Sequence, residues 1–356
     1  MLEIFFSSSK LLKTFTGHTN CANSIDYLTL DDTQCICSGS ADKTVRLWDI
    51  ETNQQIQSFN RHSGSVYCVK FSQYHHYRNN RRVICSASLD KTIRFWDVKN
   101  NRQLKLLNEH TSAVCRIEFS SFSGGRYLCS VSYDDTIRLW DVETYKSLHI
   151  FNGHTKGVWC VDISPLQNNN NDNDNKSNNI GAIGGNGYTI CSGSIDKTIR
   201  IWDIETIKQL TVFKGHEDNV NCVKYGSNKL RNIDGANTII SGSSDKSVRL
   251  WDIRSGQQIQ VFNGHKYSVY TVEYSPFVVN NIEVGSSNVI CSGSSDNTIR
   301  FWDIRSNRSE LYIIDGDNKD YGILCLKFIQ LKSNNDNRCG TNLCYGSYRG
   351  PIHICV

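Results

Sequence analysis

The chain has 356 residues, of which 38% are hydrophobic and 10% aromatic, enough for one large β domain or two ordinary domains. Its 39 basic and 35 acidic residues give a formal net charge of +4, too small an excess to indicate nucleic-acid binding by charge alone. The opening apolar stretch is too short for a signal peptide, and no long apolar run follows. We therefore expect an intracellular protein, cytoplasmic or nuclear, with no membrane contact.

The fifteen cysteines are not spaced like a disulfide framework. Their number is odd, and no C-x-x-C pair occurs. Several stand in an apolar run just before a Ser-rich turn, as in "YTICSGS", where a thiol acts as a small hydrophobic side chain. These are Cys37, Cys85, Cys129, Cys191 and Cys291. The sequence thus predicts reduced, structural thiols.

In chain order, the first expected strand is "KLLKTF" at residues 10–15, just before a Gly-His pair. The phrase D-x-[TS]-[IV]-R-[LFI]-W-D then occurs six times, each time after a Gly-His pair or a variant of it. The six Trp-Asp pairs are Trp48-Asp49, Trp96-Asp97, Trp140-Asp141, Trp202-Asp203, Trp251-Asp252 and Trp302-Asp303. A motif repeated at this period indicates a repeat architecture.

The runs between these marks are predicted to be strands. They are short, rich in Val, Ile, Thr and aromatic residues, and bounded by Gly, Ser, Asn and Asp. In "TVRLW", Val45 and Leu47 alternate with Arg46 and Trp48, the period of two that is typical of a strand. Each unit gives four antiparallel strands, which cannot bury both faces alone, so the units must stack and close.

Residues 311–356 are predicted to form a seventh, degenerate copy. Arg349 stands at the usual Asp position, Cys355 at the Trp position, and Asp317 near the His position. This copy stops after its third strand, so we expect residues 10–16 to supply the missing outer strand. Pairing of the two ends would protect an otherwise open sheet edge.

These motifs, six near-complete copies of "GH…SGSxDxTIRLWD" spread over essentially the whole chain, resemble the WD-repeat β-propellers. The resemblance implies an all-β fold over residues 1–356, a single seven-bladed propeller of four-stranded antiparallel blades. The ring is expected to be closed by the N-terminal strand pairing into the last blade. The degenerate seventh blade is expected to be the least stable one.

In this family the His, a Ser of the second strand, the turn Asp and the Trp form a buried hydrogen-bonded chain. By position, the resemblance assigns this structural role to His18, Asp42, Trp48, His62, Asp90, Trp96, His110, Asp134, Trp140, His154, Asp196, Trp202, His216, Asp245, Trp251, His265, Asp296 and Trp302. A recurring Ser, His and Asp could also indicate nucleophilic catalysis. However, the trio occurs six times, and no G-x-S-x-G elbow accompanies it, so we expect no catalytic residues and no enzyme.

Three further segments carry weaker signals. The glycine-rich residues 181–187 lack the G-K-[ST] ending of a phosphate loop and are predicted to be a flexible loop. The stretch "YHHYRNNRR", residues 74–82, could contact phosphates or an acidic partner, but a solvated loop is the simpler reading. Residues 168–179, "NNNNDNDNKSNN", are expected to be a disordered loop in the fourth blade. No metal site and no cofactor motif is predicted.

Residues that differ between the copies are the candidates for binding. By analogy with the family, the position five residues after each His lines the mouth of the central channel. Counting along the repeats gives Asn23, Tyr67, Cys115, Trp159, Asn221, Tyr270 and, in the seventh copy, Leu324. The residues before the turn Asp add apolar surface at Leu89, Tyr133 and Ile195. Rigid aromatic side chains at such a mouth suit peptide recognition, although they could instead simply plug the channel.

The function predicted from these patterns is a non-enzymatic scaffold. It would assemble a multiprotein complex by binding peptides or proteins at the mouth, as a monomeric propeller within a larger complex. The alternative is an RNP- or chromatin-associated propeller that recognises nucleic acid or a modified peptide. A strongly basic face would favour that alternative, and the charge of +4 speaks against direct nucleic-acid contact.

Overall fold

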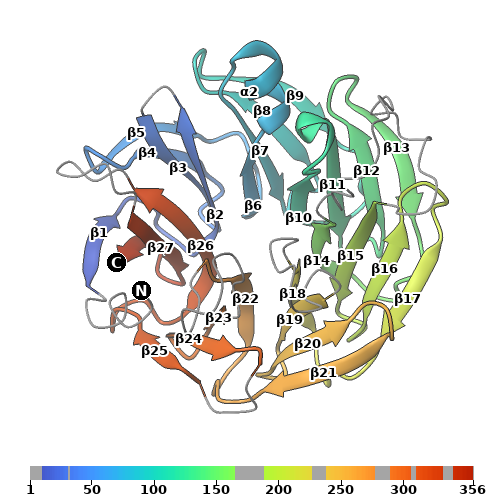
Figure 1. Cartoon of the computed structure of the whole chain (residues 1–356). Coiled ribbons are helices and arrows are strands. Elements are labelled where there is room, and N and C mark those ends of the chain that lie inside the picture. Colours follow the sequence, from blue (N-terminus) through green and yellow to red (C-terminus); the bar gives the residue numbers. More distant parts are fainter. Residues whose placement is uncertain are drawn as a thin grey trace, which may run out of the picture.

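Seven four-stranded antiparallel sheets, arranged in a ring, are formed by the described residues of the computed structural model (Figure 1). The structure describes residues 10–30, 33–164, 188–226, 238–276, 289–305, 310–331 and 340–355. We call the sheets blades one to seven in the order of their first strands. The first strand of each blade lies nearest the ring axis and the fourth lies at the outside (Figure 1).

The blades have the following strands. Blade one holds β2 (Ala22–Leu30), β3 (Thr33–Ser40), β4 (Val45–Asp49) and β5 (Gln54–Phe59). Blade two holds β6 (Val66–Phe71), β7 (Val83–Ser88), β8 (Ile93–Asp97) and β9 (Arg102–Leu107). Blade three holds β10 (Val114–Phe119), β11 (Tyr127–Ser132), β12 (Ile137–Asp141) and β13 (Lys146–Phe151). Blade four holds β14 (Val158–Ile163), β15 (Thr189–Ser194), β16 (Ile199–Asp203) and β17 (Gln209–Phe213).

The remaining three blades follow the same plan. Blade five holds β18 (Val220–Tyr225), β19 (Thr238–Ser243), β20 (Val248–Asp252) and β21 (Gln257–Phe262). Blade six holds β22 (Val269–Tyr274), β23 (Val289–Ser294), β24 (Thr298–Asp303) and β25 (Tyr312–Asp315). Blade seven holds β26 (Ile323–Leu331), β27 (Gly340–Ser347), β28 (Ile352–Cys355) and β1 (Leu11–Phe15).

Each hydrophobic core lies between two neighbouring blades. Val45 and Phe59 of blade one, for example, are buried together with Val69 and Trp96 of blade two. The six Trp side chains of the Trp-Asp pairs are all almost fully buried. Burial of one large apolar side chain contributes about 1.5–3 kcal/mol. Stacking therefore supplies the burial that a single sheet cannot provide.

The N-terminal strand closes the ring, as the sequence predicts. Strand β1 pairs antiparallel with β28, with Leu11 opposite Cys355 and Phe15 opposite Ile352. In Figure 1 the blue N-terminal strand lies beside the red C-terminal strands. The Phe15 side chain is buried in a core that joins blades seven and one.

Blade seven is smaller than the predicted range 311–356. Strand β25 pairs with β24 and belongs to blade six, so blade seven begins at Ile323. The difference arises because a sequence repeat begins with the outer strand of the preceding blade.

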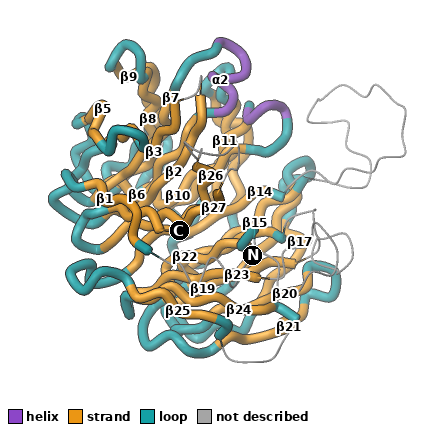
Figure 2. The backbone as a smooth tube through the Cα atoms, turned by 60° about the vertical axis from the view of Figure 1, so that its left-hand side comes forward, coloured by secondary structure: helices purple, strands orange, loops and turns teal. Residues whose placement is uncertain are grey.

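The segment "YHHYRNNRR" is not a simple solvated loop. Its first half forms helix α2 (Gln73–Asn79), which lies beside the short 3-10 helix η1 (Ser123–Gly125) of blade three (Figure 2). His75 is buried, with Nδ1 2.8 Å from Ser72 Oγ and Nε2 2.9 Å from Tyr145 OH. The loop prediction failed because Tyr145, the partner that holds His75 against blade three, lies 70 residues away and no local pattern indicates it.

Residues 168–179 and 181–187 lie outside the described residues, so the predictions made for them stay predictions. Within the described part of the chain, no helix has the length and apolar character needed to cross a membrane. All fourteen cysteines in that part are free thiols, and thirteen of them are buried.

Candidate functional site

In blades one to six, four side chains form a hydrogen-bonded chain. In blade one, Trp48 Nε1 donates to Ser38 Oγ at 2.8 Å, and this hydroxyl lies 2.7 Å from His18 Nε2. His18 Nδ1 lies 2.8 Å from Asp42 Oδ2. A neutral imidazole that donates from Nδ1 and accepts at Nε2 satisfies every group in this chain.

The equivalent chains use the residues that the family resemblance assigns, each joined by a Ser of the second strand. They are His62, Ser86, Asp90 and Trp96; His110, Ser130, Asp134 and Trp140; His154, Ser192, Asp196 and Trp202; His216, Ser241, Asp245 and Trp251; and His265, Ser292, Asp296 and Trp302.

The electrostatics of the chain in blade one favour a neutral His18 and an ionised Asp42. Burial lowers the pKa of His18, and the hydrogen bond to Asp42 only partly opposes this. Burial acts to raise the pKa of Asp42, but hydrogen bonds from His18 and Thr44 outweigh it and hold the pKa well below its usual value. The hydrogen-bonded chain thus runs through neutral Trp, Ser and His side chains and ends on a carboxylate.

This Ser–His–Asp geometry does not give a nucleophilic site. The Ser38 hydroxyl is completely buried and already accepts the indole N–H of Trp48. A nucleophile must be reachable by its substrate. The repeated array therefore stabilises the blade. Among the described residues, no three His, Cys, Asp or Glu side chains converge as a metal site.

Blade seven has a different polar network, which the sequence did not reveal. His353 Nε2 lies 3.0 Å from Asp320 Oδ1, and His353 Nδ1 lies 3.1 Å from Thr14 Oγ1 of the closing strand. Tyr345, at the register position of the Ser in other blades, donates from its hydroxyl to Asp320 Oδ2 at 3.4 Å. Asp317 contributes its backbone N–H, which donates to Asp320 Oδ2 at 3.1 Å, while its carboxylate accepts Lys319 N. The Arg349 guanidinium instead lies over the Tyr321 ring, 4.3 Å from its centroid.

The predicted mouth residues occupy a β-bulge in all seven blades. Between β6 and β7, for example, Val66 pairs with Ser88 and Cys68 with Ala87, so Tyr67 has no partner in the ladder. The same skip leaves out Asn23, Cys115, Trp159, Asn221, Tyr270 and Leu324. A bulge bends the strand and redirects a side chain, so these residues depart from the inward and outward alternation of the strands.

Three aromatic rings from three blades meet at this level. Tyr67 of blade two and Trp159 of blade four have ring centroids 5.7 Å apart. Tyr133, in the turn after β11, meets Trp159 edge-on at 5.4 Å. Because the bulge residue between them in the ring is the small, buried Cys115, the two large rings can meet across blade three. We call Tyr67, Tyr133 and Trp159 the mouth cluster.

A glycine is needed beside this cluster. A Cβ on Gly157 would lie 2.5 Å from Cδ1 of Tyr133 and 3.3 Å from Cδ1 of Ile195. The loop before β14 can therefore approach the Tyr133 ring only without a side chain. Leu89 and Tyr133 are 46% and 38% exposed, so apolar surface is open to a partner here.

The other mouth residues are less uniform. Asn23 Nδ2 and Asn221 Nδ2 each donate to a carbonyl of the next blade, Val66 O and Val269 O, at 2.9 Å. Asn221 and Cys115 are buried, which takes them out of reach of a partner on the surface. Tyr270 and Leu324 are partly exposed, and Tyr270 lies apart from the mouth cluster, near Tyr348 and Cys21.

Deeper along the axis, the first strands carry a level of charged residues. Lys70 Nζ lies 2.6 Å from Glu118 Oε2, and Lys327 Nζ lies 2.5 Å from Asp26 Oδ1. Lys224 Nζ reaches both Asp162 Oδ1, at 3.4 Å, and Glu118 Oε2, at 3.7 Å. The sequence signal for this level was one charged residue at the same position of every first strand. These ion pairs tie blades together below the mouth.

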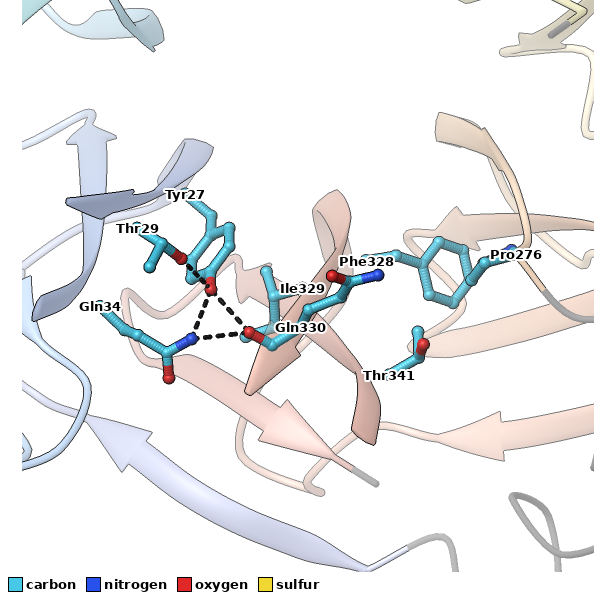
Figure 3. A pocket seen from close by; sticks show the side chains of 8 residues that line it. All are labelled: Tyr27, Thr29, Gln34, Pro276, Phe328, Ile329, Gln330 and Thr341. Atoms are coloured by element: carbon cyan, nitrogen blue, oxygen red, sulfur yellow. Dashed lines mark hydrogen bonds between the residues drawn. The ribbon is translucent and has the colours of Figure 1, made fainter. Parts of the chain in front are cut away.

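A cavity of about 530 Å³ lies at the other end of the first strands, between blades seven and one (Figure 3). On one side its polar groups bond to one another: Gln34 Nε2 donates to Tyr27 OH and to Gln330 O, both at 2.7 Å. Phe328 and Pro276 line the opposite side (Figure 3). The polar groups therefore join the two blades at the closure of the ring.

Seven four-stranded blades around one axis, with the repeated polar chains inside them, define this molecule as a seven-bladed β-propeller. Six segments match the family described as "WD domain, G-beta repeat", at residues 9–49, 53–97, 101–141, 145–203, 207–252 and 256–303. The chain therefore belongs to the WD-repeat family, whose propellers typically serve as protein-interaction scaffolds and are generally non-catalytic.

Two proteins show local similarity. The mitogen-activated protein kinase kinase kinase A of Dictyostelium discoideum is 41% identical over 66 residues, which are 18% of this chain and 7% of that protein. The U3 small nucleolar RNA-associated protein 15 homolog of Xenopus tropicalis is 36% identical over 69 residues, 19% of this chain and 13% of that protein. The chain thus matches only a small part of the length of either relative.

Proposed function

We propose that this chain is a non-enzymatic scaffold that assembles a multiprotein complex by binding peptide segments of its partners at the mouth cluster. The observation that carries the proposal is the meeting of Tyr67, Tyr133 and Trp159 at bulged or turn positions of three blades. Clustered aromatic side chains on a rigid frame lose little entropy on binding and commonly dominate interface energies.

The chemistry of the mouth differs from that of the blades. The polar chains of blades one to six repeat the same residue types, whereas the bulge positions hold Asn, Tyr, Cys, Trp and Leu. A scaffold needs one rigid frame and a surface that distinguishes partners, and this division of residues supplies both.

The alternative function, recognition of nucleic acid or a modified peptide, has one observation in its favour. A relative carries the name U3 small nucleolar RNA-associated protein, but the similarity covers 69 residues. A segment of that length is common to repeat proteins. Caging of a methylated lysine requires open space between aromatic rings, whereas the rings of the mouth cluster already contact one another.

The test compares captured partners by quantitative mass spectrometry for the wild-type chain and the double variant Trp159→Ala, Tyr67→Ala. Ile259→Ala is the matched control, because Ile259 is 52% exposed on the outer strand β21, away from the mouth. We expect the double variant to lose partners that the control retains. Full retention of all partners by a folded double variant would contradict the proposal.

A further inference from the structure

Blade three carries an arginine where the other six blades carry small side chains. The residue directly after each bulge residue lies at the same point of the first strand and pairs with the same point of the second strand. These residues are Ser24, Cys68, Arg116, Cys160, Cys222, Thr271 and Cys325. This level lies between the mouth cluster and the deeper level of ion pairs.

The small side chains at this level pack against the next blade. Cys160 Sγ lies 3.6 Å from Val220 O of blade five, and Cys325 Sγ lies 3.5 Å from Ala22 O of blade one. A guanidinium on a three-carbon stem is too large for such a space between blades. The side chain of Arg116 therefore extends toward the ring axis.

The charge of Arg116 acts on distant blades, as this placement requires. Burial raises the pKa of Cys222, in blade five, and of Cys325, in blade seven, to about 12, and Arg116 opposes both rises. Among the described residues, Arg116 has no ion-pair partner within 4.0 Å, whereas Lys224 and Lys327 one level deeper are both paired. Arg116 thus lies beneath the mouth cluster without a close ion pair, and the carboxylate of Glu118, two residues along the same strand, acts on its charge.

The turns around the mouth cluster carry charged side chains of both signs. Lys91, Lys156 and Lys197 are exposed, and each lies within two residues of Leu89, Gly157 or Ile195. At the turn position that Lys91 and Lys197 occupy, blade three has Asp135, which is half-buried. With Arg116 these are four positive charges. Asp90, Asp134 and Asp196, which directly follow Leu89, Tyr133 and Ile195 and are ionised in the polar chains, bring the negative charges to four, so the rim itself has no net positive charge.

We infer that the mouth cluster binds an acidic peptide segment. An apolar side chain of the peptide lies on the rings of Tyr67 and Trp159, and a neighbouring Asp or Glu side chain points down to Arg116. This inference rests on the proposed scaffold function and specifies the class of partner.

The charges and rings favour this occupant over two others. A cationic side chain would meet Arg116 at close range, where like charges repel. Stacking of RNA bases needs free ring faces, but Tyr133 meets Trp159 at an interplanar angle of 69° and covers part of it. A carboxylate next to an apolar residue matches both parts of the site.

The test is a selection from a displayed library of random 12-residue peptides on the full chain. Peptides that bind the wild type but not Trp159→Ala form the cluster-dependent pool. We expect this pool to be enriched in Asp and Glu beside an apolar residue. For single peptides from it, Glu→Gln at the critical position should weaken binding to the wild type about ten-fold, since a charge-assisted hydrogen bond is lost.

Arg116→Met keeps the length of the side chain and removes its charge. It should bind the Glu and Gln peptides equally, while Arg116→Lys restores part of the preference. Arg102→Met is the matched control, because Arg102 is exposed on the outer strand β9, and it should behave as wild type.

The outcomes separate this inference from the proposed function. A cluster-dependent pool without acidic enrichment, or one whose Glu preference survives in Arg116→Met, would overturn the acidic-peptide inference and leave the scaffold proposal intact. Absence of any cluster-dependent pool would overturn both. Binding of a labelled 12-residue oligo-uridine that is lost in Trp159→Ala would favour the nucleic-acid alternative and count against both.

Discussion

Removal of the carboxylate of Asp196 should destabilise the propeller strongly. Its side chain is only 4% exposed, and it accepts hydrogen bonds from His154 Nδ1 at 2.8 Å, Thr155 N at 3.1 Å, Thr198 N at 3.0 Å and Thr198 Oγ1 at 2.6 Å. In Asp196→Ala the buried His154 loses its acceptor, and water cannot fully replace it. The Thr198 hydroxyl can rotate toward another acceptor, and Thr155 N lies in an exposed loop.

The magnitude follows from the donors left without partners. A buried donor without a partner costs about 1–3 kcal/mol, and loss of the charge-assisted part adds to this. We therefore expect Asp196→Ala to lower the free energy of unfolding by about 3 kcal/mol. Unfolding entropy of about 2.1 cal/mol/K per residue gives about 0.7 kcal/mol/K for the whole chain. The melting temperature should fall by about 4 °C.

The assay is thermal unfolding followed by circular dichroism, with Asp203→Ala as the control in the same blade. Asp203 accepts only the exposed backbone N–H groups of Glu205 and Thr206, which water can satisfy, so this variant should lose at most about 1 kcal/mol. Equal melting temperatures for the two variants would refute the assignment of Asp196 to a buried polar chain.

Three further predictions concern pH, closure and the mouth. Burial lowers the pKa of His154 and lowers that of His75 to about 4. Because both folded-state pKa values lie below the unfolded value of about 6.5, the stability that the neutral side chains contribute should be complete above pH 6.5 and fall as acid is added. Melting temperatures measured from pH 7 to pH 4 should show this fall, and His75→Gln should show a smaller one. Phe15→Ala removes a buried ring of the closing strand and should lower the free energy of unfolding by about 3–4 kcal/mol. Amide hydrogen exchange should become faster in β28 than in the strands of blade three, and equal acceleration in all blades would contradict this. Gly157→Ala places a Cβ 2.5 Å from the Tyr133 ring, so it should weaken partner capture, whereas Gly256→Ala, far from the mouth, should not.

The architecture could be predicted because it is written in repeated local patterns. The phrase that ends in Trp-Asp marks the turn and the third strand of six blades. The matching runs before His18 and His216 indicated that residues 10–16 would complete blade seven. Alternation of Val45 and Leu47 with Arg46 follows directly from strand geometry.

Contacts between blades could not be predicted in the same way. The bulge at Trp159 depends on pairing with β15, more than 30 residues away. The network of His353, Asp320 and Thr14 joins both ends of the chain, and no local pattern marks it. The side chain of Arg116 was overlooked because its significance lies in the small residues at the same level of the other blades.

The structure separates the residues that hold the blades from those that are free to specify a partner. The polar chain of blade four, from Trp202 to Asp196, lies within one blade, and neither Trp159 nor Arg116 takes part in it. The bulge leaves residue 159 outside the strand ladder, so its side chain can change without the loss of a ladder pair. Residue 116 is different, because it stays in the ladder opposite Val131 and packs at a level where six blades hold small side chains. An arginine at this level leaves less room for side chains to pack between the blades. An anionic group bound at the mouth would supply the close ion-pair partner that Arg116 lacks.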